Sequence, residues 1–177
     1  MTVEAVVAVG ALLGIERLSY IGISRHPRAF ARLCATVSSR RLDPTTGVAL
    51  VFAMSKGIQA TVCLWWCWTA GAGEWWPPTG PVPAMVAGGI LMATGQILNA
   101  AVFQRLGMAG VFYGNRFGRP LPRVTVFPFS WFSHPQYVGA LMTVWGFFLV
   151  MRFPGPDWFV VPVIETAWYV LGAHVER

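Results

Sequence analysis

The sequence predicts an all-α integral membrane protein, a helical bundle of four to five membrane helices whose last two form a tight hairpin. Of its 177 residues, 55% are hydrophobic and only 11% are charged, whereas a soluble domain carries about 25% charged residues. Nine tryptophans suit the boundary between lipid and water, where an amphipathic ring is favoured. The length fits one membrane-embedded domain, residues 1–177, with no separate soluble domain.

The first apolar segment, residues 3–24, carries Glu16 and Arg17. The sequence therefore leaves open whether this segment spans the bilayer or lies at its surface. Further membrane helices are expected at residues 46–71, 82–107, 136–151 and 158–175. The last two would reach only about 24–27 Å against about 30 Å of hydrocarbon. The Pro-Gly-Pro sequence between them predicts a sharp turn.

Basic residues gather in two loops, residues 25–45 and 105–135, whereas residues 71–81 contain neither lysine nor arginine. The two basic loops are therefore predicted to face the cytoplasm. This pattern favours a topology signal over contact with nucleic acid, so no nucleic-acid partner is expected. The three cysteines lack the C-x-x-C spacing of a metal site, and no metal is expected. The composition favours a bacterial inner membrane over the endoplasmic reticulum.

Polar residues within the apolar segments are candidates for function. Gly88, Gly95 and Asn99 share one helical face, which fits either the close packing of another helix or the wall of a pocket. In the second case Gln96 or Asn99 would bond to a ligand. Glu165 lies in the last segment, where a carboxylate is costly unless it is paired. It is either functional or a structural partner of a cation such as Arg17 or Lys56.

Residues 123–139, RVTVFPFSWFSHPQYVG, interrupt the apolar sequence. The His134-Pro135 pair is predicted to end any preceding helix and to place His134 and Tyr137 near the first turn of the next one. Anionic groups are favoured at that end of a helix. The aromatic residues nearby suit either an interfacial belt or the wall of a cation site.

Residues 107–139 resemble the phospholipid methyltransferase family. They contain its G-x-x-G-x-x-x-G-x-x-F-G run and its highly specific R-V-T-x-F-P-F string. The resemblance is strongest over residues 88–177, and the first 75 residues match in hydropathy alone. It implies an S-adenosylmethionine-dependent N-methyltransferase of phosphatidylethanolamine, or of its mono- and dimethyl derivatives, toward phosphatidylcholine. The lipid would come from the bilayer, and the active site would lie on the cytoplasmic side.

The resemblance also implies roles for individual residues. In the family, a Gly-x-Gly sequence and a glutamate pair hold the cofactor, and Gly95 and Glu176 are the members kept here. The implied cofactor-binding residues are Gly95, Tyr113, Gly114, Phe117, Phe129, His134, Tyr137 and Glu176, with backbone amides near residues 135–138 for the carboxylate. The implied headgroup-binding residues are Asn115, Arg116, Arg119 and Arg123.

The acceptor amine must lose a proton, for which His134 is the first candidate and Glu165 the second. Two departures from the family pattern keep other acceptors open. Asn115 stands where the phosphatidylethanolamine enzymes commonly have aspartate, and His134-Pro135 where they have Asn-Pro. The His-Pro pair is more similar to the isoprenylcysteine carboxyl methyltransferases, so a prenylcysteine carboxylate or another apolar thiol or carboxylate is the alternative acceptor. A nicotinamide-dependent enzyme resembling sterol reductases and a non-enzymatic helical protein are further alternatives.

Overall fold

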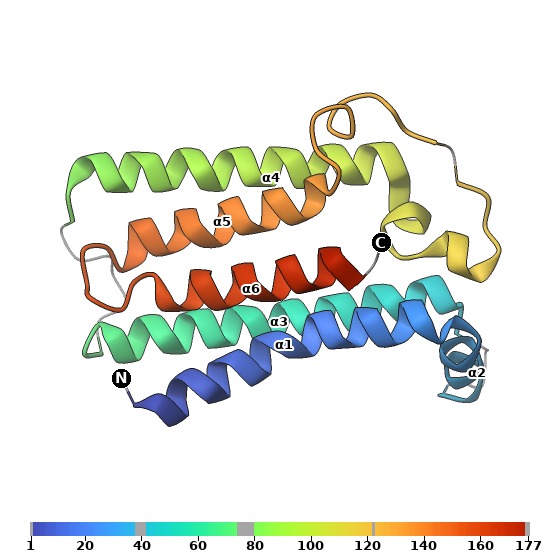
Figure 1. Ribbon diagram of the computed structural model, residues 1–177, viewed down its shortest axis with the longest axis horizontal. Coiled ribbons are helices and arrows are strands. Elements are labelled where there is room, and N and C mark those ends of the chain that lie inside the picture. Colours follow the sequence, from blue (N-terminus) through green and yellow to red (C-terminus); the bar gives the residue numbers. More distant parts are fainter. Residues whose placement is uncertain (1, 38–41, 74–79, 122, 176–177) are drawn as a thin grey trace.

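The computed structural model describes residues 2–37, 42–73, 80–121 and 123–175, which contain helices and no strand. This arrangement confirms the predicted all-α bundle (Figure 1). The helices are α1 (Val3–Arg25), α2 (Pro27–Val37), α3 (Pro44–Ala70), α4 (Val82–Val111), the short 3-10 helix η1 (Gly114–Phe117), α5 (Pro135–Met151) and α6 (Val160–Val175).

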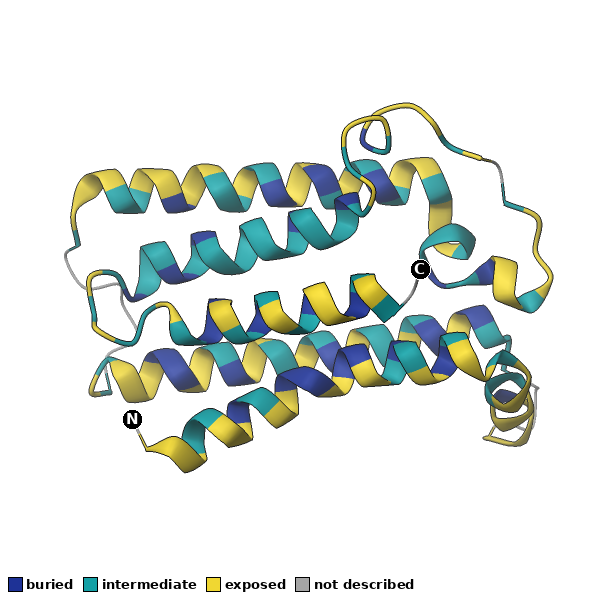
Figure 2. Cartoon of the chain, viewed as in Figure 1, coloured by how far each residue is buried: buried dark blue, intermediate teal, exposed yellow. Residues whose placement is uncertain are grey.

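Within the described residues, three segments are long and apolar enough to cross a membrane: α1, α3 and the stretch from α4 through η1. The first segment, left open by the sequence, is thus a helix of spanning length. Helices α5 and α6 are shorter and apolar. Exposed residues run along the outer faces of the helices (Figure 2). Many of them are large and hydrophobic, as expected where lipid is the solvent. Among them are Val7, Leu18, Met54, Val86, Ile90, Ile97 and Val170.

Helices α4 and α5 lie side by side along their length (Figure 1). Glycines allow this approach, because a Cβ atom added at Gly88 would lie 2.6 Å from the carbonyl oxygen of Gly146. A Cβ atom at Gly95 would likewise meet the carbonyl oxygen of Gly139. The glycines of the predicted face therefore serve helix packing, while Asn99, one turn further along, lines the cavity described below.

Helix α5 begins as the sequence predicted. Pro135 takes its first position, where a missing N–H costs nothing, and His134 immediately precedes it. Helix α3 begins in a similar way at Pro44, after Asp43, whose carboxylate accepts a hydrogen bond from the backbone N–H of Thr46 at 3.2 Å. These two starts lie at the same end of the bundle (Figure 1).

The described parts of both basic loops also lie at this end, which we call the α2 end (Figure 1). The residue 25–45 stretch is not a plain loop, because it contains helix α2. The sequence did not reveal α2, since its exposed arginines Arg28 and Arg32 resemble a topology signal. Helix α2 packs against α3 and η1. Arg119, in the second basic loop, forms an ion pair with Asp43 at 2.9 Å.

Candidate active site

A cavity of about 450 Å³ lies among α1, α3, α4, α5 and α6. Its volume is that of a small-molecule site. Its lining combines apolar side chains with polar groups from every one of these helices. The polar residues apart from tyrosine are Glu16, Arg17, Lys56, Gln59, Gln96, Asn99, Ser133, His134, Gln136 and Thr143.

All four tyrosines of the chain line this cavity, although they come from separate parts of the sequence. The rings of Tyr20 and Tyr113 lie 5.8 Å apart, and those of Tyr137 and Tyr169 lie 5.2 Å apart, both edge to face. Aromatic faces attract cations. The tyrosines therefore bring to the cavity ring faces that can hold a cation.

The guanidinium of Arg17 occupies part of this aromatic surface. Its central carbon lies 3.8 Å from the ring centre of Tyr169, 4.5 Å from that of Tyr137 and 5.6 Å from that of Tyr20. Arg17 is only 4% exposed. A buried charge in a membrane protein is costly unless it is paired, and here Glu16 supplies the counter-charge.

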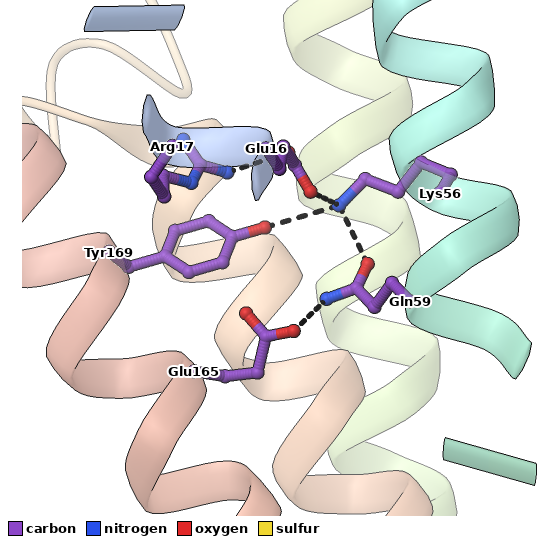
Figure 3. A network of polar contacts seen from close by, with 6 residues as sticks. All are labelled: Glu16, Arg17, Lys56, Gln59, Glu165 and Tyr169. Carbon is purple, nitrogen blue, oxygen red and sulfur yellow. Dashed lines mark hydrogen bonds and ion pairs between the residues drawn. The ribbon is translucent and has the colours of Figure 1, made fainter. Parts of the chain in front are cut away.

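The charged residues form one network between helices (Figure 3). Glu16 Oε1 accepts from Arg17 Nη2 at 2.9 Å, and Oε2 accepts from Lys56 Nζ at 3.0 Å. Lys56 also donates to Gln59 Oε1 at 2.8 Å and to the hydroxyl of Tyr169 at 3.3 Å. All three donors of the ammonium are thereby used. The network ties α1, α3 and α6 together.

Glu165 joins the network through a neutral amide. Its carboxylate accepts a hydrogen bond from Gln59 Nε2 at 2.5 Å (Figure 3). Arg17 and Lys56, the cations considered from the sequence as its partners, bond to Glu16 instead. Glu165 is 2% exposed and does not line the cavity. Its catalytic role stays a prediction.

His134 and Phe129 both line the cavity, as expected for site residues. The imidazole of His134 stacks on the ring of Tyr137, with ring centres 5.5 Å apart and planes 19° apart. Two of the first backbone amides of α5 already have hydrogen-bond partners within the chain. The N–H groups of Tyr137 and Val138 donate to the carbonyl oxygen of His134 at 3.0 and 3.2 Å.

On α4, both Gln96 and Asn99 line the cavity. Gln96 donates to the hydroxyl of Thr143 on α5 at 3.0 Å. The side-chain oxygen of Asn99 is buried and has no hydrogen-bond partner among the described residues. Asn99 therefore has the acceptor that a ligand N–H group would satisfy, as the pocket interpretation of this face requires.

Three of the predicted cofactor residues lie outside the cavity lining. Gly95 packs on α5, as described above. Gly114 makes a tight contact, since a Cβ atom there would lie 2.6 Å from the carbonyl oxygen of Ala109. Phe117 packs near Phe30 of α2, with ring centres 6.2 Å apart. Glu176 lies outside the described residues. The cofactor roles of these four residues stay predictions.

The predicted headgroup residues are exposed at the α2 end, outside the cavity lining. They are Asn115, Arg116, Arg119 and Arg123. Of these, Arg119 is held by Asp43. The headgroup roles of all four are untested.

Sequence reasoning missed several residues that line the cavity: Glu16, Tyr20, Gln59 and Tyr169. A signal was present for Glu16, because a carboxylate and a lysine in two different apolar segments are natural partners. Nothing in the sequence indicated that the tyrosines would converge. They are separated by tens of residues, and only packing brings them together.

An apolar helical bundle with a polar, aromatic-lined cavity among its helices is typical of a membrane protein that binds a ligand. The comparisons specify its kind. Residues 83–177 match the family model described as phospholipid methyltransferase. The chain is also 36% identical, over 137 residues, to a phosphatidyl-N-methylethanolamine N-methyltransferase of Arabidopsis thaliana, an alignment that covers 77% of this chain and 73% of that protein.

The chain therefore belongs to the phospholipid methyltransferase family and is an enzyme of phospholipid N-methylation. No solved structure matches it. The matches do not favour a prenylcysteine or other apolar thiol or carboxylate acceptor. A methyl donor and a lipid substrate in a membrane follow from the family.

Proposed function

We propose that this enzyme transfers methyl groups from S-adenosylmethionine to the amine of phosphatidylethanolamine, or of its mono- and dimethyl derivatives, toward phosphatidylcholine. The observation that carries the proposal is the tyrosine-lined cavity inside an apolar bundle. The related Arabidopsis thaliana protein, named for a phosphatidyl-N-methylethanolamine substrate, supports a partly methylated acceptor.

The residues present fit S-adenosylmethionine as the donor. When bound, it supplies an electrophilic methyl group on a sulfonium cation. Tyr113 and Phe129 offer aromatic faces to such a cation, while the ring of Tyr137 already lies against Arg17 and His134. The unpartnered oxygen of Asn99 offers an acceptor for an N–H group. Gly95 and Glu176 are added to this set by family resemblance alone.

The acceptor amine must present a lone pair. A primary amine is mostly protonated at neutral pH, as lysine is. His134 is half-buried in the cavity wall, and imidazole is the side chain suited to accept a proton near neutrality. We propose that a ring nitrogen of His134 accepts the proton that the amine loses. Glu165 is the second candidate. It lies outside the cavity lining but accepts a hydrogen bond from Gln59, which lines the cavity.

We place the active site on the cytoplasmic side of a bacterial inner membrane. Both basic loops lie at the α2 end, as the positive-inside rule requires of a cytoplasmic end. His134 and Tyr137 lie near the start of α5, at that same end. The lipid would enter sideways from the bilayer, and Arg116 and Arg123 would attract its headgroup to this end, because basic residues at the surface attract anionic headgroups.

The test uses purified protein in mixed lipid–detergent micelles with methyl-labelled S-adenosylmethionine. Phosphatidylethanolamine, its monomethyl form and its dimethyl form are offered separately, and mass spectrometry identifies the labelled product. We expect label on at least one of these amines. If no amine lipid is labelled while a prenylcysteine carboxylate is, the proposed acceptor is wrong.

A further inference from the structure

The guanidinium of Arg17 is deeply buried but incompletely bonded. Its hydrogen bond to Glu16 uses Nη2 alone. Its Nε atom is buried and has no hydrogen-bond partner among the described residues. A guanidinium carries five N–H donors in a rigid fork and no acceptor, and buried donors are nearly always bonded. Because Arg17 lines the cavity, a ligand is the natural source of the missing acceptor.

The bonding of the nearby carboxylates leads to the same conclusion. Glu16 divides its two oxygens between Arg17 and Lys56, so one carboxylate serves two cations. The second buried carboxylate, Glu165, bonds to the neutral amide of Gln59 rather than to either cation. An oxyanion of the ligand beside Arg17 would therefore add an acceptor that neither carboxylate supplies.

Other donors in the wall are less suited to an anion. Lys56 already donates to Glu16, Gln59 and Tyr169. At the start of α5, the amides of Tyr137 and Val138 donate to the carbonyl oxygen of His134. The arginines of the second basic loop are exposed and outside the cavity lining. Among the described residues of the wall, Arg17 is the cation with a free buried donor.

The plane of the guanidinium is also fixed before any ligand arrives. Tyr169 and Tyr137 lie within cation–π distance of its centre, at 3.8 and 4.5 Å, and Glu16 holds one nitrogen. A planar fork held in this way is suited to an oxyanion, which accepts two parallel hydrogen bonds from it.

We propose that Arg17 binds an oxyanion of the ligand through its Nε edge, while Glu16 holds Nη2. The oxyanion is either the phosphodiester of the lipid headgroup or the carboxylate of the methyl donor. This inference rests on the proposed methyl transfer. It makes α1 part of the active site, although α1 lies outside residues 83–177, which match the family.

The experiment compares wild type with Arg17→Gln and Arg17→Lys. Calorimetry measures the Kd of S-adenosylmethionine and of its decarboxylated analogue. Kinetics measure the KM of monomethyl phosphatidylethanolamine and of a long-chain N-methylamine that lacks phosphate. Arg25→Gln is the matched control, because it removes the same charge from an exposed position on the same helix.

Arg17→Gln is expected to raise the Kd of the donor or the KM of the acceptor by at least tenfold. Arg17→Lys is expected to restore part of this loss, since lysine keeps the charge but lacks the planar guanidinium. If the carboxylate binds Arg17, wild type prefers the intact donor over the decarboxylated one and Arg17→Gln loses that preference. If the phosphodiester binds, the same loss appears between the two acceptors. Arg25→Gln should preserve both preferences.

A folded Arg17→Gln variant that keeps both preferences overturns the proposal. So does an equal loss for ligands with and without the anion, since that marks a structural role. Should Arg17→Gln fail to fold, Arg17→Lys decides by the same comparison. An active wild type with no effect at Arg17 refutes this inference alone, whereas a wild type that neither binds donor nor transfers methyl refutes the proposed function with it.

Discussion

Lys56 of α3 and Glu16 of α1 are joined by an ion pair of 3.0 Å inside an apolar bundle. The Glu16 side chain is only 7% exposed, and its second oxygen holds Arg17. Removing one partner of a buried pair leaves an uncompensated charge, which costs far more than the pair contributes. The network is therefore sensitive to single substitutions.

The first prediction concerns Glu16→Gln. It leaves Arg17 and Lys56 without their shared carboxylate, and we expect a loss of about 3–5 kcal/mol in the free energy of unfolding. Thermal unfolding in detergent measures it. Glu4→Gln, on the exposed first turn of the same helix, should change stability little. Adding Lys56→Met to Glu16→Gln should recover part of the loss, and no recovery would contradict the pairing.

The second prediction separates two roles of Gly95. A Cβ atom there would meet the backbone of α5 at Gly139, so Gly95→Ala should push α4 from α5 and cost about 1–3 kcal/mol. Gly89→Ala is the control, because nothing lies within 4 Å of a Cβ atom at that position. It should be neutral or slightly stabilising. If Gly95→Ala leaves stability intact but weakens donor binding, Gly95 serves the cofactor and not the helix contact.

The third prediction tests the aromatic surface. Tyr137→Leu removes a ring face that lies 4.5 Å from the Arg17 centre, and Tyr137→Phe keeps that face. Because cation–π attraction depends on the ring, we expect kcat/KM to fall at least about tenfold more in Tyr137→Leu than in Tyr137→Phe, or about 1.4 kcal/mol. Equal losses in the two variants would mean that the hydroxyl matters and the ring face does not.

The fourth prediction concerns His134→Gln. If the imidazole accepts the amine proton, kcat should fall by about 10²-fold, while the Kd of S-adenosylmethionine changes little. A matched fall in donor affinity and rate would instead make His134 a cofactor ligand.

The sequence predicted those parts of the structure that depend on local signals. Hydropathy located the spans, and the His134-Pro135 pair located the start of α5. Helix α2 was missed, because a short arginine-bearing helix and a basic loop share one composition. The predicted all-α bundle is confirmed, and the helix that the sequence did not reveal lies where charge and helical propensity overlap.

The candidate site was predicted in part. The cavity is lined by four of the predicted residues, His134, Tyr113, Phe129 and Tyr137. All four lie within residues 107–139, the stretch whose motifs indicated a site. Glu16 and Gln59 could not be assigned, since their partners come from other helices. Whether Lys56 pairs with Glu16 or with Glu165 depends on how α1, α3 and α6 pack. No single stretch of sequence determines that packing.

The ion pair between Glu16 and Lys56 also bears on how the chain enters the bilayer. Helix α3 contains Lys56 and no acidic residue between Pro44 and Ala70, so it brings an unneutralised cation into the membrane. Its carboxylate lies on α1, which leaves the ribosome earlier. The chain is thus ordered so that the counter-charge precedes the charge, and stable insertion of α3 depends on an α1 already in place to receive it.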